Sequence, residues 1–153
     1  MTSLRENIKK SLDDNLKKRD NIATATLRLI LAAVKDSDIE NRSKKKGDTI
    51  SDEQILLLLQ NMVKQRKESA DIYLSQNRPE LAKIETDQAD IIKQFLPEQL
   101  TEIEIEKIVS EIISKINASG MKDMGKVMGL ATKELSGKAD GKTISQIVRK
   151  NLS

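Results

Sequence analysis

The sequence predicts an all-α protein, and three observations support this class. Apolar residues recur at helical spacing along most of the chain, no segment shows the alternating pattern of a strand, and two segments open with a capping box. The chain contains one Tyr, one Phe and no Trp, so its core must be aliphatic. We predict two parts, an N-terminal four-helix part over residues 1–96 and a C-terminal three-helix part over residues 97–153.

Two amphipathic helices are expected at the start of the chain. The first carries an aliphatic residue at every fourth position: Leu4, Ile8, Leu12 and Leu16. Asp20 and Asn21 are good helix caps and mark a break. The second helix starts at about Ile22, and its wide apolar stripe, which includes Leu29 and ends at Val34, indicates either the central helix of this part or the face of a dimer.

The third and fourth helices follow a polar loop over residues 41–49, whose three consecutive lysines either are solvated or contact an anionic partner. Ser51 and Gln54 form a capping box between two isoleucines that make a hydrophobic staple, so a long helix should run to about Leu74. Pro79 suits the first turn of the fourth helix. That helix carries a run of apolar residues: Leu81, Ile84, Ile91, Ile92 and Phe95.

The C-terminal part begins after Leu96, because Pro97 disfavours a helical conformation in the residue before it. Thr101 and Glu104 form a second capping box. The helix that follows has an apolar stripe of Ile105, Ile108, Val109, Ile112 and Ile116. Gly120 is expected to end this helix, and two further helices complete the part, the last with Ile144, Ile147, Val148 and Leu152.

Gly125 and Gly129 are four residues apart and therefore lie on the same face of a helix. Glycine costs roughly 1 kcal/mol relative to alanine in a helix interior, so this spacing suggests a use. We expect close approach of another backbone, which belongs either to a neighbouring helix of the same domain or to a ligand.

The next two glycines are interpreted as turn residues. Gly137 follows the apolar residue Leu135 and fits a left-handed helix stop. Asp140 and Gly141 form a turn dipeptide in which Asp140 also caps the helix that starts near Thr143. Asp123 is assigned a similar turn or capping role. The stretch is therefore predicted as a helix, a tight turn and a helix.

Composition excludes much chemistry. The absence of Cys and His removes disulfides, thiolate nucleophiles, zinc sites of these ligands and a histidine base, and we expect no catalytic residue set, metal or cofactor. The first residues lack the apolar core of a signal peptide, and no apolar run reaches the roughly 20 residues of a membrane span, so we expect a cytoplasmic protein without membrane contact.

Charge is distributed unevenly along the C-terminal part. Residues 121–153 carry seven basic and three acidic residues, whereas residues 97–118 carry two basic and five acidic residues. The basic excess on the glycine-bearing segment favours phosphate as a ligand.

Several motifs, in this order along the chain, resemble those of the YqeY family, and the resemblance covers nearly the whole chain. They are Leu27-Arg28, Lys64-Gln65-Arg66-Lys67-Glu68-Ser69, Arg78-Pro79-Glu80-Leu81-Ala82, Phe95-Leu96-Pro97-Glu98-Gln99-Leu100, residues 122–129 and Gly137-Lys138-Ala139-Asp140-Gly141. The resemblance implies that the C-terminal part is similar to the helical tail of the GatB subunit of tRNA-dependent amidotransferases. In that subunit the tail contacts tRNA, while the chemistry takes place in a catalytic body that has no counterpart here. We therefore carry over the binding role of the tail and not the ligase activity.

Our first functional hypothesis is a tRNA-binding module. Its candidate contacts to the phosphate backbone are Lys122, Lys126, Lys133, Lys138, Lys142, Arg149 and Lys150. Gly125, Gly129, Gly137 and Gly141 would let the RNA backbone come close, and the N-termini of the last two helices could add N–H donors. The scarcity of aromatic residues argues against stacking on single-stranded bases, so we expect recognition of shape and phosphate and no sequence-specific binding of DNA.

Two other classes of function stay open. A protein–protein adaptor would dock on an amidotransferase or an aminoacyl-tRNA synthetase through Met121, Met124 and Met128, although core packing is the favoured explanation of such a stripe. A stand-alone amidase-like enzyme with Ser and Lys chemistry, using glutamine as the nitrogen donor, would need a positioned base, and none is visible in the sequence.

Overall fold

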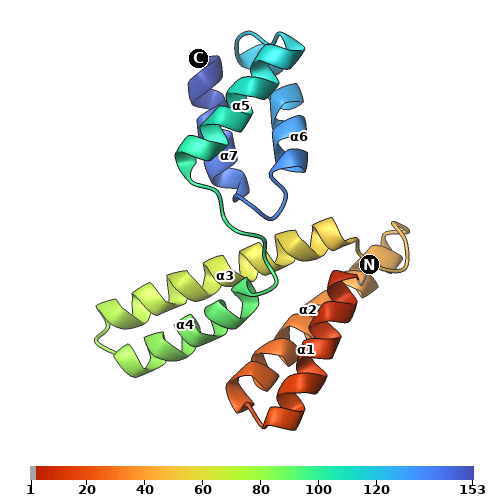
Figure 1. The fold of residues 1–153 in the computed structure, drawn as a ribbon, viewed down its shortest axis with the longest axis vertical. Helices are drawn as coiled ribbons and strands as arrows, with labels where there is room; N and C mark the ends of the chain where they lie inside the picture. Colours follow the sequence, from red (N-terminus) through yellow and green to blue (C-terminus); the bar gives the residue numbers. More distant parts are fainter. Residues whose placement is uncertain (1–2) are drawn as a thin grey trace. The chain divides into compact units, whose positions relative to one another are not determined.

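The computed structural model describes residues 3–153, and every regular element in this range is a helix (Figure 1). The prediction of an all-α protein is therefore confirmed. The chain forms two compact units, Met1–Leu96 and Pro97–Ser153, which we call the first and the second unit. Within the described range, no helix combines the length and the apolar character that crossing a membrane requires.

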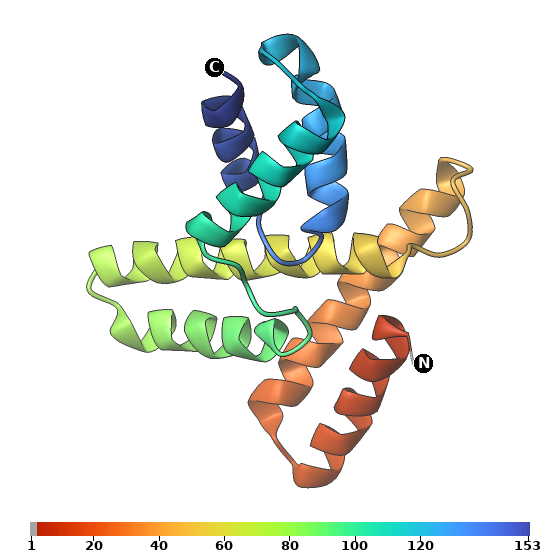
Figure 2. The same ribbon diagram turned by 45° about the horizontal axis from the view of Figure 1, so that its top comes forward.

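The first unit holds four helices: α1 (Leu4–Lys18), α2 (Asn21–Ser43), α3 (Asp52–Ser75) and α4 (Pro79–Lys93). α2 and α3 each contact all the other helices of the unit, so the contacts do not single out α2, and its role as the central helix stays a prediction. The core is aliphatic and takes residues from all four helices: Ile8, Leu27, Ile30, Val34, Ile55, Leu59 and Ile92. α4 packs along the C-terminal part of α3 (Figure 2).

The predicted start signals of these helices are confirmed. The Asp20 carboxylate accepts the N–H of Ala23 at 3.0 Å and caps α2. Ser51 and Gln54 bond reciprocally as a capping box, and the two isoleucines of its staple are buried. Pro79 occupies the first turn of α4. Local sequence therefore sets where these three helices begin.

α2 departs from its prediction in two respects. Leu29, which belongs to the predicted stripe, is 45% exposed, because the stripe is wider than the surface that the core covers. The helix also continues to Ser43, so the loop predicted to begin at residue 41 begins later. The physical reason lies at Asp38, which is buried and hydrogen-bonded to Arg5 and to the N–H of Ile50, and which thereby anchors the last turns of α2.

One of the large apolar residues predicted for α4 lies on its exposed side. Ile84 is 51% exposed, whereas Ala82, Ala89 and Ile92 are buried against the unit. Ile84 is two residues from Ala82 and therefore lies on the opposite side of the helix.

The second unit contains α5 (Glu102–Ile116), the short 3₁₀ helix η1 (Met121–Asp123), α6 (Met124–Glu134) and α7 (Gly141–Leu152). The capping box of Thr101 and Glu104 is confirmed. The predicted stop at Gly120 is wrong, because Asn117 takes the left-handed conformation that ends α5, with φ of 56°. Asparagine tolerates this conformation better than most residues do. The core of the unit is formed by one side of each α-helix: Ile105, Val109, Ile112, Val127, Ala131, Leu135, Ile144, Val148 and Leu152.

Candidate nucleic-acid interface

The core of the second unit determines which sides of α6 and α7 reach the solvent. Val127 and Ala131 of α6 are fully buried, and so is Val148 of α7. The opposite sides of both helices are therefore outward faces. All seven predicted basic residues are exposed, and they lie on α6, on α7, on η1 and in the connection between α6 and α7.

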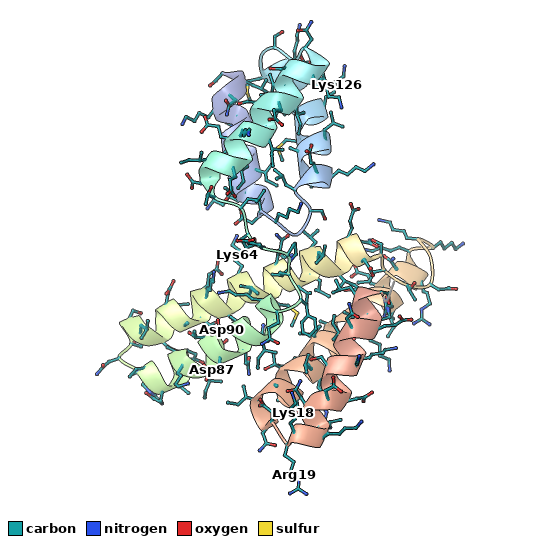
Figure 3. All side chains as sticks on the ribbon, viewed as in Figure 1. Lys18, Arg19, Lys64, Asp87, Asp90 and Lys126 are labelled. Carbon is teal, nitrogen blue, oxygen red and sulfur yellow. The ribbon has the colours of Figure 1, made fainter. Side chains whose placement is uncertain are left out.

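The outward face of α6 pairs two lysines with two glycines. Lys126 and Lys133 are about two helical turns apart and lie on the same side of the helix. Figure 3 shows the side chain of Lys126 directed from α6 into the solvent, away from the core of the second unit. Gly125 and Gly129 lie beside them and are exposed. Leu130, which is 44% exposed, completes this face.

The two glycines of α6 are not needed for packing within the second unit. A Cβ atom built on Gly125 or Gly129 would meet no atom of the described residues within 4 Å, and the same holds for Gly141. The interpretation of Gly125 and Gly129 as a helix–helix crossing inside the domain is therefore wrong. Close approach of a ligand stays a prediction for these positions.

The connection between α6 and α7 is held from the start of the unit. Gly137 is buried and has φ of 76°, which confirms the predicted left-handed conformation. Its carbonyl accepts a hydrogen bond from Gln99 Nε2 at 2.7 Å. The carbonyl of Lys138 accepts the N–H of Leu100 at 3.0 Å, while the Lys138 side chain is exposed. The hydrogen bond therefore fixes the backbone at Lys138, while the ammonium group of its side chain lies in the solvent.

α7 contains no acidic residue, and its outward face carries Lys142, Arg149 and Lys150. The carboxylate of Asp140 accepts the N–H of Thr143 at 2.7 Å, which confirms the predicted cap. This carboxylate lies where a phosphate at the helix N-terminus would bind, and its negative charge would repel that phosphate. The cap therefore argues against a phosphate contact at the N-terminus of α7.

η1 leads into α6 and places Lys122 at the surface. Asp123 accepts the N–H of Ser119 at 2.9 Å and so closes the turn before α6, but its side chain does not cap that helix. The turn role predicted for Asp123 is confirmed, and the capping role is wrong.

Charge is distributed unevenly between the helices of the second unit. α5 carries four glutamates against two lysines, α6 carries Glu134 beside its two lysines, and α7 carries cations and no acidic residue. Among the described residues, these cations take part in none of the ion pairs within 4.0 Å, which join residues of the first unit. The cations of α6 and α7 are consequently available to an external anion.

The methionines of this region mostly belong to the core. Met124 and Met128 are half-buried and pack against the buried cluster of the second unit, which favours the core-packing interpretation over an exposed docking stripe. Met121 is 48% exposed. Nowhere in residues 3–153 do three acidic side chains gather in a way that could hold a metal ion.

Sequence reasoning missed the role of Gln99. Its amide donates to the carbonyls of Pro97 at 3.0 Å and of Gly137 at 2.7 Å, and it thereby joins the start of the unit to the turn before α7. No local pattern could have revealed this role, because Gln99 and Gly137 are far apart in the sequence. The family-like motif that contains Gln99 was the only signal at this position.

Comparison with known proteins gives a consistent picture. A family model described as Yqey-like protein matches residues 5–152. Altered inheritance of mitochondria protein 41 of Clavispora lusitaniae is 27% identical over 136 residues, which cover 89% of this chain and 74% of that protein. An uncharacterized protein of Schizosaccharomyces pombe is 31% identical over 96 residues, covering 63% of this chain and 74% of the relative.

A shorter similarity extends to an archaeal enzyme. A subunit of the glutamyl-tRNA(Gln) amidotransferase of Thermococcus sibiricus is 46% identical over 57 residues, which cover 35% of this chain. The matched segment is only 9% of that subunit. The similarity to the amidotransferase is therefore confined to one small segment of its subunit.

Proposed function

The chain belongs to the YqeY family of Yqey-like proteins, and from this premise we propose that it is an accessory module that binds tRNA through its second unit. The segment shared with an amidotransferase subunit supports RNA as the ligand, because the name of that relative includes a tRNA substrate. The small extent of the match supports a binding role without the ligase reaction. We place the function in the cytoplasm, although several yeast relatives are named as mitochondrial, and cell fractionation would test that assignment.

The outward face of α6 is the observation that carries the proposal. Lys126 and Lys133 provide two positive charges on one side of the helix, and the glycines between and beside them leave the helix backbone uncovered. This combination favours a sugar–phosphate backbone as the ligand, because close approach shortens the distance between each phosphate and the ammonium groups. Lys138 and the three cations of α7 extend the positive charge of the unit.

The residues of the outward face of α6 are suited to contacts with phosphates and not to stacking on bases. The chain has one Phe and one Tyr, and both belong to the first unit, so the second unit has no aromatic side chain on which a base could stack. We therefore expect it to recognise the shape and charge of folded RNA.

Fluorescence anisotropy with labelled tRNA tests the proposal. We expect the double variant Lys126→Glu with Lys133→Glu to lose at least roughly tenfold in affinity, because two attractive contacts become repulsive. The matched control is Lys107→Glu with Lys115→Glu, which makes the same change of charge on exposed positions of α5. Equal losses in both double variants would mean that only net charge matters, and no loss in either would exclude this face.

A protein-docking role is the second candidate, and two exposed apolar residues support it. Met121 and Leu130 are 48% and 44% exposed, the first in η1 just before α6 and the second on the outward face of α6. The partner would be an amidotransferase or an aminoacyl-tRNA synthetase. Binding of the purified partner in the presence of ribonuclease, together with weakening by Leu130→Glu and no affinity for tRNA, would favour this role over the first.

A further inference from the structure

α2 carries a second surface that its own unit does not cover. Seven of its exposed residues lie on the side opposite the buried stripe and follow alternating steps of three and four: Ile22, Ala25, Leu29, Ala32, Asp36, Ile39 and Ser43. We call these seven positions the α2 seam. The three large aliphatic side chains of the seam are each about half exposed, at 52%, 45% and 50% along the chain.

The spacing of the seam is that of a helix which packs against another helix. An average step of 3.5 residues is the pattern of the knob positions of a coiled coil. α2 already buries a separate stripe, with Leu27, Ile30 and Val34, in the core of the first unit. The seam is therefore not needed for folding of this unit, and a surface helix without a partner would ordinarily be polar along that side.

One flank of the seam is uniformly basic. Arg28, Lys35 and Arg42 each directly precede a seam residue, and all three are exposed. Within the described range none of them forms an ion pair closer than 4.0 Å, although the charge of Arg42 acts on Asp38. The other flank starts with Thr26, which is buried, and ends with the exposed Glu40, whose carboxylate is paired with Lys44. A helix that docks on the seam therefore meets positive charge along its open side.

This charge pattern argues against a second copy of the chain as the occupant. In an antiparallel pair of seams, the basic flanks would face each other and bring Arg28 of one copy near Lys35 of the other. In a parallel pair, Asp36 of one copy would face Asp36 of the other. Either arrangement places like charges together, which opposes association.

We propose that the α2 seam binds an amphipathic helix of another protein, one with aliphatic residues at heptad spacing and acidic residues along one flank. The aliphatic residues of that helix cover Ile22, Leu29 and Ile39, and its acidic flank pairs with Arg28 and Lys35. A basic or amide side chain of the partner lies opposite Asp36, because a buried carboxylate needs a donor.

Two synthetic peptides test the seam with the full chain. Both have three heptads with leucine at the seam positions, and the flanking residues are glutamate in one peptide and lysine in the other. We expect the glutamate peptide to bind in fluorescence anisotropy, and the lysine peptide to bind at least roughly tenfold more weakly. Reversal of the flank by Arg28→Glu with Lys35→Glu should exchange this preference.

The apolar part of the seam is tested by Leu29→Glu. This variant should weaken binding of the glutamate peptide at least roughly tenfold. The matched control is Leu74→Glu on α3, where the leucine is 58% exposed and the affinity should stay the same. Circular dichroism checks that both variants keep their helical content.

Three outcomes would overturn the proposal. Equal affinity for both peptides would show that charge does not select the partner. Equal effects of Leu29→Glu and Leu74→Glu would show that the seam is not the docking surface. Sedimentation equilibrium provides the third test, since a dimer of the chain that Leu29→Glu disrupts would identify a second copy as the occupant.

Discussion

Arg5 and Asp38 form a two-point ion pair that joins α1 to α2. Arg5 Nη1 donates to Asp38 Oδ2 at 2.8 Å, and Nη2 donates to Oδ1 at 2.9 Å. The same Oδ1 accepts the N–H of Ile50 at 2.8 Å. One buried carboxylate thus holds the start of α1, the end of α2 and the residue before the capping box of α3.

Replacement of this carboxylate should destabilise the first unit. Asp38 is 6% exposed, so Asp38→Ala leaves the Arg5 guanidinium and the Ile50 N–H without their acceptor. We expect a loss of about 2–3 kcal/mol in the free energy of unfolding, because the pair is only partly shielded from water on the arginine side. Urea denaturation measures it. Glu40→Ala is the control, because its ion pair with Lys44 is exposed, and an equal loss there would contradict the argument.

The same pair should make stability depend on pH in the acid range. The hydrogen bonds from Arg5 hold the pKa of the Asp38 carboxyl below its usual value, and the Ile50 N–H adds to this effect, while burial opposes it. A carboxyl with a lowered pKa in the folded state contributes stability that is fully present above its unfolded pKa, about 3.9, and is lost as the pH falls through the folded value. The stability difference between the wild type and Asp38→Asn should therefore be constant from neutral pH down to about 5 and should shrink below about 4. Urea titrations at several pH values measure this difference, and a difference that grows on acidification would refute the assignment.

Helix starts were largely predictable from the sequence, because the responsible interactions are local. Ser51 and Thr101 bond to backbone N–H groups three residues ahead, and Asp140 does the same at α7. Such bonds depend on residue types at a fixed short spacing, which the sequence displays directly.

Other features depend on contacts between distant segments, and the sequence could not reveal them. The end of α2 follows from the contact of Asp38 with Arg5, which no periodicity shows. Hydrophobic pattern alone could not tell that Leu29 and Ile84 point outward, because a wide stripe offers more apolar surface than the neighbouring helices cover. The candidate interface shows the same division, since its cations could be named from the sequence but the uncovered glycine face of α6 required the packing of the whole unit.

Gly137→Ala should destabilise the second unit. Gly137 has φ of 76° and is buried, so an alanine there adopts a strained backbone conformation. We expect a loss of about 1–2 kcal/mol in the free energy of unfolding. Differential scanning calorimetry of the full chain should show the second unit melting earlier. An unchanged transition would mean that the turn can take another conformation.

The proposed RNA face also predicts a change in salt dependence. Lys126→Gln with Lys133→Gln removes two cations without adding repulsion, so fewer counterions are released when RNA binds. The slope of log affinity against log salt concentration should become shallower by about 1.5. Lys107→Gln with Lys115→Gln on α5 should leave the slope unchanged, and equal changes in both double variants would remove the special role of α6.

Gly129→Ala should change the stability of the second unit and its affinity for tRNA in opposite directions. The new Cβ atom meets no described atom within 4 Å, and alanine favours the interior of α6, so the second unit should gain about 0.5–1 kcal/mol in stability. The same methyl group lies on the outward face between Lys126 and Lys133, where it holds an approaching RNA backbone away, so tRNA affinity should fall. Ser110→Ala on an exposed position of α5 is the control, because it raises helix propensity without touching this face. A variant that is more stable and also binds tRNA as tightly as the wild type would show that Gly129 serves neither packing nor binding, and the close-approach role of this glycine would be abandoned.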